Sequence, residues 1–182
     1  MESRRKRTIR SDDALEANTI AEGHNLAGQS SARSGMHDAL AVFLGHWEAA
    51  GTSYGGTDQS GGDPKANGVS WTSLHTGRWH TGEFFLIQDE RAKIDGKTVF
   101  DTLTVLGVDP ETRTYFARSF ENHGFYRHYS LAAEGNIWTL TGPNERAQTE
   151  FRDNDRTQVI NWEWKPDDTW LPLCNRTAFR TD

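Results

Sequence analysis

The sequence predicts an all-β protein, an antiparallel up-and-down barrel of about nine or ten strands with a short N-terminal helix. Three observations predict this. From Trp47 onward, apolar side chains alternate with a period of two. Turn residues separate these segments at a spacing of roughly 10–12 residues. The 17 Gly and 5 Pro suit tight turns. Closing the hairpins into a barrel removes exposed strand edges, and an open sandwich is the alternative.

Two regions differ sharply in composition. Residues 1–34 are polar and charged, with few large apolar side chains, and are predicted to form a flexible tail. Residues 35–182 are predicted to form the barrel domain. The basic residues 4–7 are followed by Asp12 and Asp13 instead of an apolar segment. This pattern is unlike a secretory signal, so the sequence predicts a cytoplasmic protein.

A short helix is expected over residues 35–44. One helical face carries the apolar side chains Met36, Leu40, Phe43 and Leu44. His37 is expected on the polar side, Ser34 as the N-cap, and Gly45 as the residue that ends the helix. A helix this short is unstable alone. We therefore expect it to dock over one end of the barrel.

The first strand is expected to begin at Trp47, whose face continues with small residues, as in the crowded interior of a small barrel. Residues 55–68 form a connection long enough for a flap or a binding loop. Thr76 and Gly77 are expected to form a tight hairpin turn. The other expected strands are residues 69–75, 79–88, 97–108, 114–121, 125–131, 137–141, 146–151, 158–165 and 171–180.

Charge and cysteine content argue against several classes of function. A formal net charge of -6 disfavours nucleic acid as a partner. No apolar run of about 18 residues is present, so no membrane-spanning helix is expected. Cys174 is the single cysteine, which excludes an internal disulfide framework and a cysteine-based zinc site. The seven histidines lack the spacing of a compact metal site. We expect neither a metal nor a cofactor.

Aromatic residues are abundant, with seven Trp, nine Phe and four Tyr. Such rings supply either a core or the wall of a ligand pocket, and the sequence leaves both open. In the ninth expected strand, Ile160, Trp162 and Trp164 share one face, which indicates a dry interior. The sequence thus predicts a small hydrophobic ligand inside the barrel. The predicted ligand-binding residues are Trp71, Trp79, Phe85, Arg127, Trp162 and Trp164.

Two other hypotheses remain open. Asp101, Tyr126 and His128, with Arg127, are candidates for acid–base groups of a cofactor-independent isomerase or cyclase, because a histidine beside a carboxylate exchanges protons near neutral pH. Surface ion pairs are the simpler interpretation. No nucleophile elbow or phosphate-binding loop is present. Residues 84–87 are apolar on both faces, so a homodimer is also possible.

The opening Gly45-His46-Trp47, after a short helix and before a chain of hairpins, resembles the Gly-x-Trp signature of the lipocalin and calycin superfamily. The chain resembles more closely the uncharacterised bacterial family DUF1579. The matching segments are residues 37–47, 76–79, 106–110, 135–138, 170 and 176–180. This resemblance implies a lipocalin-like barrel and no particular activity. A weaker resemblance to nitrobindin-like haem barrels implies a histidine-bound haem, although no particular histidine aligns.

Overall fold

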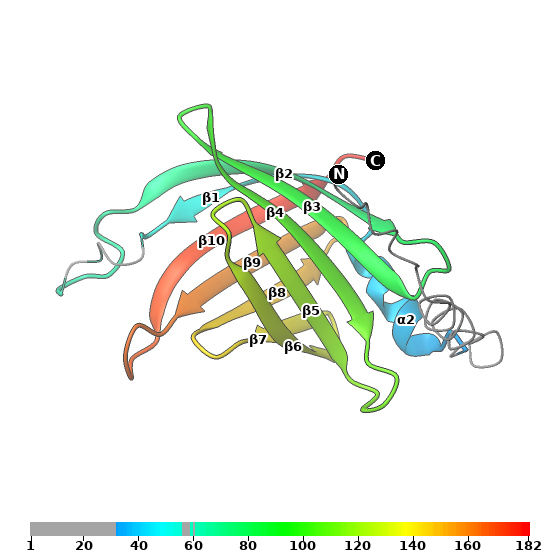
Figure 1. Cartoon of the computed structure of the whole chain (residues 1–182). Helices are drawn as coiled ribbons and strands as arrows, with labels where there is room; N and C mark the ends of the chain where they lie inside the picture. The colour runs from blue at the N-terminus through cyan, green and yellow to red at the C-terminus, as the bar shows by residue number, and fades with distance from the viewer. Residues whose placement is uncertain (1–31, 56–58, 60) are drawn as a thin grey trace, which may run out of the picture. The chain divides into compact units, whose positions relative to one another are not determined.

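The structure, a computed structural model, describes residues 32–55, 59 and 61–182 (Figure 1). The predicted flexible tail, residues 1–34, lies outside the described residues except for residues 32–34. In the part of the chain that is described, no helix has the length and apolar character needed to cross a bilayer.

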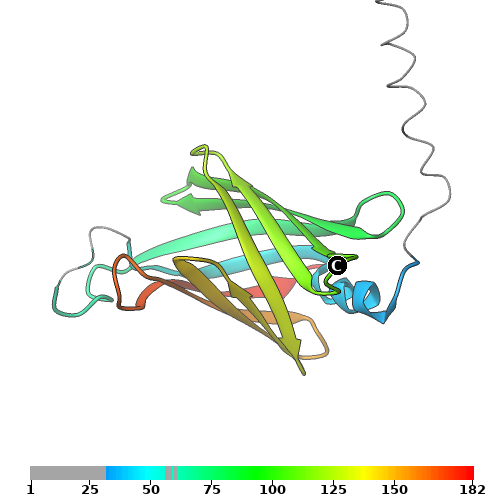
Figure 2. The same cartoon turned by 60° about the horizontal axis from the view of Figure 1, so that its bottom comes forward.

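Ten antiparallel strands close into a barrel in which each strand pairs with its neighbours in sequence and β1 pairs with β10 (Figures 1 and 2). The strands are β1 (Gly45–Ser53), β2 (Val69–Trp79), β3 (Phe85–Ile94), β4 (Lys97–Val108), β5 (Tyr115–Glu121), β6 (Tyr126–Glu134), β7 (Ile137–Thr141), β8 (Glu145–Arg152), β9 (Thr157–Trp164) and β10 (Leu171–Arg180). The predicted up-and-down barrel is confirmed.

The meander gives the barrel two different ends. The helix end carries α2 (Gly35–Ala39) and the 3-10 helix η1 (Leu40–Phe43), which lead directly into β1. The loop end carries the β1–β2 connection and the short turns that follow β3, β5, β7 and β9. Figure 1 shows α2 beside the end of the barrel where β10 finishes.

The predicted short helix is present, but its last turn is a 3-10 helix and His37 is buried, not on a polar face. Leu40 and Phe43 are spaced three apart in the 3-10 helix and so lie on the same side. His37, in the preceding α-helical turn, is buried as they are. The His37 Nδ1 accepts a hydrogen bond from the Ser34 backbone N–H at 3.1 Å, and its ring meets Phe84 edge-on at 5.5 Å. His37 therefore caps the start of the helix and also packs against Phe84.

The predicted hairpin turn at Thr76 and Gly77 is wrong. Strand β2 runs through both residues to Trp79, and the chain turns at residues 80–84. Gly77 instead allows a close approach, because a Cβ there would lie 1.9 Å from the backbone oxygen of Phe43. Gly77 is therefore not a turn residue but the place where η1 lies against β2.

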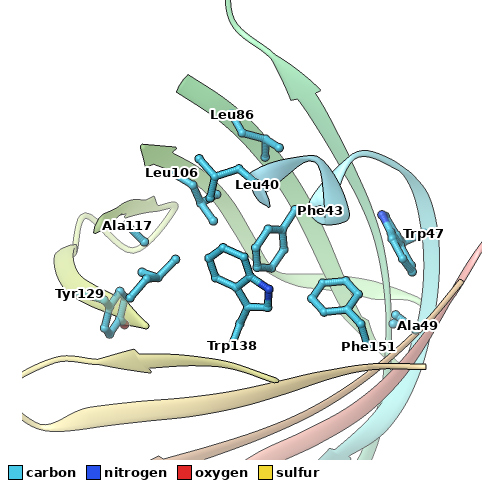
Figure 3. Packing of buried hydrophobic residues seen from close by; sticks show 12 residues of the cluster. Leu40, Phe43, Trp47, Ala49, Leu86, Leu106, Ala117, Tyr129, Trp138 and Phe151 are labelled. Carbon is cyan, nitrogen blue, oxygen red and sulfur yellow. The ribbon is translucent and has the colours of Figure 1, made fainter. Parts of the chain in front are cut away.

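A cluster of apolar side chains fills the helix end (Figure 3). Phe43 meets the rings of Trp138 and Phe151 edge-on, with centroids 5.0 and 5.1 Å apart. Trp47 is 1% exposed, and its indole N–H donates to the Leu44 carbonyl at 3.2 Å. Trp47 is therefore inside the barrel, as the small residues on its face of the strand indicate.

Candidate functional site in the barrel interior

Strand register identifies the residues that face the interior, because directly paired residues in antiparallel strands lie on the same face. Trp47 is inward and pairs with His75, which pairs with Glu90, which pairs with Thr102. Gly51, on the same face of β1, pairs with Trp71 and with Arg176. The interior near the loop end thus differs from the apolar helix end, because charged and polar side chains project into it.

An ion pair between Arg176 and Glu90 lies inside the barrel. Its side chains are 11% and 22% exposed, and Arg176 also reaches the Ser73 hydroxyl at 3.4 Å. The guanidinium extends from β10 past β1 and β2 to β3. Gly51 lets β1 lie close to β10 beside Arg176, since a Cβ there would lie 1.9 Å from the Asn175 backbone oxygen and 2.7 Å from the Arg176 Cα. Burial lowers the pKa of Arg176 to about 10, so the group keeps its charge at neutral pH.

His75 lies deeper in the same interior and is 2% exposed. Its ring stacks on Trp47, with centroids 5.7 Å apart and an interplanar angle of 3°. Burial, and then the positive charge of Arg176, lowers the pKa of His75 to about 2, while the Gln158 side chain opposes the shift. His75 is therefore neutral at physiological pH.

Buried polar atoms without partners concentrate on this face. Within the described part of the chain, the buried side-chain nitrogen and oxygen atoms that lack a hydrogen bond of good geometry all belong to inward-facing residues. They are Trp71 Nε1, His75 Nδ1 and Nε2, Thr102 Oγ1, Gln158 Nε2, Arg176 Nε and Arg180 Nε. Such groups are costly when buried and often mark places where another molecule supplies the bond.

A second charged group lies at the rim of the loop end. Arg127 pairs with Glu121 and, through Nε, with Glu145 at 3.0 Å. The Tyr129 hydroxyl donates to the other Glu145 oxygen at 2.7 Å, and burial together with this carboxylate raises the pKa of Tyr129. A pocket of about 280 Å³ opens here between β6 and the β7–β8 turn. Its lining residues are Phe125, Tyr126, Arg127, His128, Tyr129, Pro143, Asn144 and Glu145.

A smaller pocket of about 220 Å³ lies at the loop end of β9 and β10. Its lining includes the inward-facing Trp162 and Cys174, together with Tyr54 and Lys65 of the β1–β2 connection. Burial, and then the charge of Glu145, raises the pKa of Cys174 to about 12. The thiol is therefore protonated and inert as a nucleophile at neutral pH.

Of the predicted ligand-binding residues, Trp71, Trp162 and Trp164 face the loop-end interior, and Arg127 lies at its rim. Trp162 packs edge-on against Tyr129 at 5.6 Å, and Trp164 donates from Nε1 to Gln59 at 2.7 Å. These four residues therefore share one region of the barrel.

Trp79 and Phe85 do not join this region. Trp79 faces inward at the helix end, beneath the Arg33 guanidinium at 5.1 Å. Phe85 is 41% exposed on the outer face, where it tilts against Phe116 at 6.3 Å. Phe85 therefore lies outside the barrel interior, because the inward position of this strand belongs to Leu86, which is fully buried.

The structure does not bring the proposed acid–base residues together. Asp101 lies on the outer face, where it accepts a hydrogen bond from Arg91 at 3.1 Å. Tyr126 is 56% exposed and lies beside His128, with ring centroids 6.2 Å apart, also on the outside. Strand register thus places Asp101, Tyr126 and His128 on outward-facing positions, and Tyr126 and His128 border the pocket at the rim.

Among residues 32–55, 59 and 61–182, no three histidine, cysteine, aspartate or glutamate side chains gather as metal ligands do. His24 lies outside the described residues. His75 occupies an inward-facing strand position, whereas His46 and His128 lie on outward-facing positions.

Sequence reasoning missed the residues that distinguish this interior, namely Glu90, Arg176, His75 and Gln158. A signal was present for Arg176. It shares a face with Ala178 in β10, and the opposite strand carries Ala49 and Gly51 on the same side. An arginine facing a run of small residues indicates a side chain that lies across its neighbours.

The comparisons with known proteins assign the chain to no family. No family model matches the chain, so membership of DUF1579 has no support from that comparison, and no curated protein matches it either. Among solved structures, the chain is similar to the zebrafish ileal bile acid-binding protein complexed with cholic acid. The identity is 10%, the TM-score is 0.39, and the match covers 77% of this chain and 99% of the other.

Proposed function

We propose that the protein binds a small, mainly apolar molecule in the loop-end half of its barrel interior. The observation that carries this proposal is the coincidence, on one inward face, of aromatic rings with buried polar atoms that lack partners. Trp71, Trp162 and Tyr129 supply apolar wall area, and the helix end is already filled by the protein's own side chains.

The energetics support a ligand in this half of the barrel. A buried polar group without a hydrogen bond costs about 1–3 kcal/mol, and a ligand atom that completes the bond recovers part of that cost. The two loop-end pockets measure about 280 and 220 Å³, and their linings include Tyr129 and Trp162 respectively but not the unpartnered atoms themselves. These volumes lie just below the range of roughly 300–1,000 Å³ typical of drug-sized ligands, which favours a small molecule.

The neutral fluorophore N-phenyl-1-naphthylamine tests the proposal, because its emission rises when it enters an apolar site. A saturable rise is expected for the wild type. Thr102→Trp places a bulky ring on the inward face and is expected to abolish the signal. Leu103→Trp is the matched control, because Leu103 is the next residue and is 39% exposed on the outer face. Equal signals from both variants, or none from the wild type, would contradict interior binding.

The acid–base enzyme is not proposed, since its three residues do not converge. The haem alternative remains a prediction from the sequence and is tested by the visible spectrum after hemin is added. A cytoplasmic location also remains a prediction.

A homodimer has one supporting observation. Leu103, Phe120 and Tyr126 are paired in register on the outer face of β4, β5 and β6, and each is at least 39% exposed. Analytical ultracentrifugation tests whether this face mediates self-association, by comparing the mass of the wild type in solution with that of the Phe120→Ser variant.

A further inference from the structure

The ion pair between Arg176 and Glu90 lies on the inner face of the barrel, where it would contact the polar group of a bound ligand. We propose that Glu90 is a specificity-determining residue that occupies the anion position beside Arg176, so that the site accepts a neutral hydrogen-bond acceptor such as a ketone and rejects a carboxylate. This inference rests on the proposed function and names the ligand class for the same site.

The unpartnered atoms favour an acceptor on the ligand. Trp71 Nε1 and Arg176 Nε can only donate hydrogen bonds, and the Thr102 hydroxyl can also donate. Trp71 and Arg176 flank Gly51 in register, and Thr102 pairs with Glu90. A carbonyl oxygen at the inner face of these strands therefore meets donors on several sides, whereas an alkane leaves every one of them unsatisfied.

The charges disfavour an anion. The Arg176 guanidinium already pairs with Glu90, and the neighbouring His75 is neutral, so the positive charge at this place is already matched by a carboxylate. At the rim, Glu121 and Glu145 place two carboxylates around the single guanidinium of Arg127. The Lys65 ammonium lines the neighbouring pocket, so the rim itself is balanced in charge. A ligand carboxylate that reaches Arg176 lies beside Glu90, where like-charge contact is strongly unfavourable.

Three nine-carbon probes that differ only in their polar group separate these effects. Nonane, 2-nonanone and nonanoate are used at neutral pH to displace N-phenyl-1-naphthylamine from the wild type. We expect 2-nonanone to bind about tenfold or more tightly than nonanoate, because like-charge contact costs several kcal/mol. Nonane is expected to bind more weakly than the ketone, because it offers no acceptor.

Substitution of the carboxylate tests the role of Glu90 directly. In Glu90→Gln the guanidinium loses its charged partner, and nonanoate is expected to gain about tenfold or more in affinity, reversing the order. Asp89→Asn is the matched control, because Asp89 precedes Glu90, is 49% exposed and pairs with Arg78 on the outer face. It is expected to leave all three affinities unchanged. The double variant Glu90→Gln/Arg176→Gln is expected to lose the gain for nonanoate.

The outcomes separate this inference from the proposed function. Nonanoate binding to the wild type as tightly as 2-nonanone overturns the inference, and this measurement needs no variant to fold. Failure of Glu90→Gln to gain affinity for nonanoate, with the fluorophore still bound, also overturns it. Absence of saturable fluorophore binding to the wild type instead overturns the proposed function.

Discussion

Replacement of Gly77 by alanine tests how the helical segment is seated. The new Cβ would lie 1.9 Å from the Phe43 oxygen and 2.8 Å from the Phe43 carbonyl carbon. Both are backbone atoms, so no side-chain rotation relieves the contact. The 3-10 helix η1 must therefore move away from β2 and withdraw Leu40 and Phe43, which are 0% and 5% exposed.

The magnitude follows from the burial of those two side chains. Each fully buried Leu or Phe contributes about 1.5–3 kcal/mol, so complete undocking costs roughly 3–6 kcal/mol. A partial shift loses less, and alanine restores about 0.4–1 kcal/mol by restricting the unfolded chain. We expect Gly77→Ala to lower the free energy of unfolding by about 2–5 kcal/mol. For a chain of this size each kcal/mol corresponds to about 2–4 °C in Tm.

Urea unfolding followed by tryptophan fluorescence measures this change. Gly62→Ala is the matched control, because a Cβ at Gly62 meets nothing within 4 Å and Gly62 is not in the left-handed region. Its effect is expected to stay within about 0.5 kcal/mol. A Gly77→Ala variant as stable as the wild type would refute the reasoning, because it would mean that the Phe43 backbone does not lie against Gly77.

Three further predictions concern interior groups. Burial and Arg176 hold the pKa of His75 at about 2, well below its unfolded value, so its contribution to stability is present above about pH 6.5 and is lost as the pH falls. Between about pH 7 and pH 5, the wild type is expected to lose about 2 kcal/mol more unfolding free energy than His75→Gln; equal losses would contradict the buried neutral imidazole. The Cys174 thiol, with its pKa raised to about 12, is expected to react with a thiol reagent at least tenfold faster in urea than in the native state. Tyr129→Phe removes the hydroxyl that donates to Glu145, and is expected to cost about 1–2 kcal/mol in thermal unfolding.

The fold was predictable because alternation and turn chemistry are local signals. Ile160, Trp162 and Trp47 were expected on the inward face, and strand register places them there. The prediction of a hairpin turn at Gly77 was wrong for a physical reason. A glycine that permits close packing and a glycine that permits a turn look the same in sequence, and only the position of η1 distinguishes them.

The site was harder to predict because its key contact joins distant strands. Glu90 and Arg176 lie 86 residues apart, and barrel closure between β1 and β10 brings them together. In β4 neither face is purely apolar. Thr102 faces inward and Asp101 faces outward, so a polar residue occurs on each face, because the loop-end interior is itself polar. Alternation of apolar residues therefore could not indicate which face points inward.

The central claim, that a small molecule occupies the loop-end interior, is tested most directly by the tryptophan indole N–H signals in a ¹⁵N NMR titration with N-phenyl-1-naphthylamine. The Trp71 indole nitrogen is buried without a partner, whereas the Trp47 indole already donates to Leu44. We expect the Trp71 signal to shift saturably while the Trp47 signal stays in place. A saturating fluorophore that leaves the Trp71 signal unmoved would contradict binding in the barrel interior.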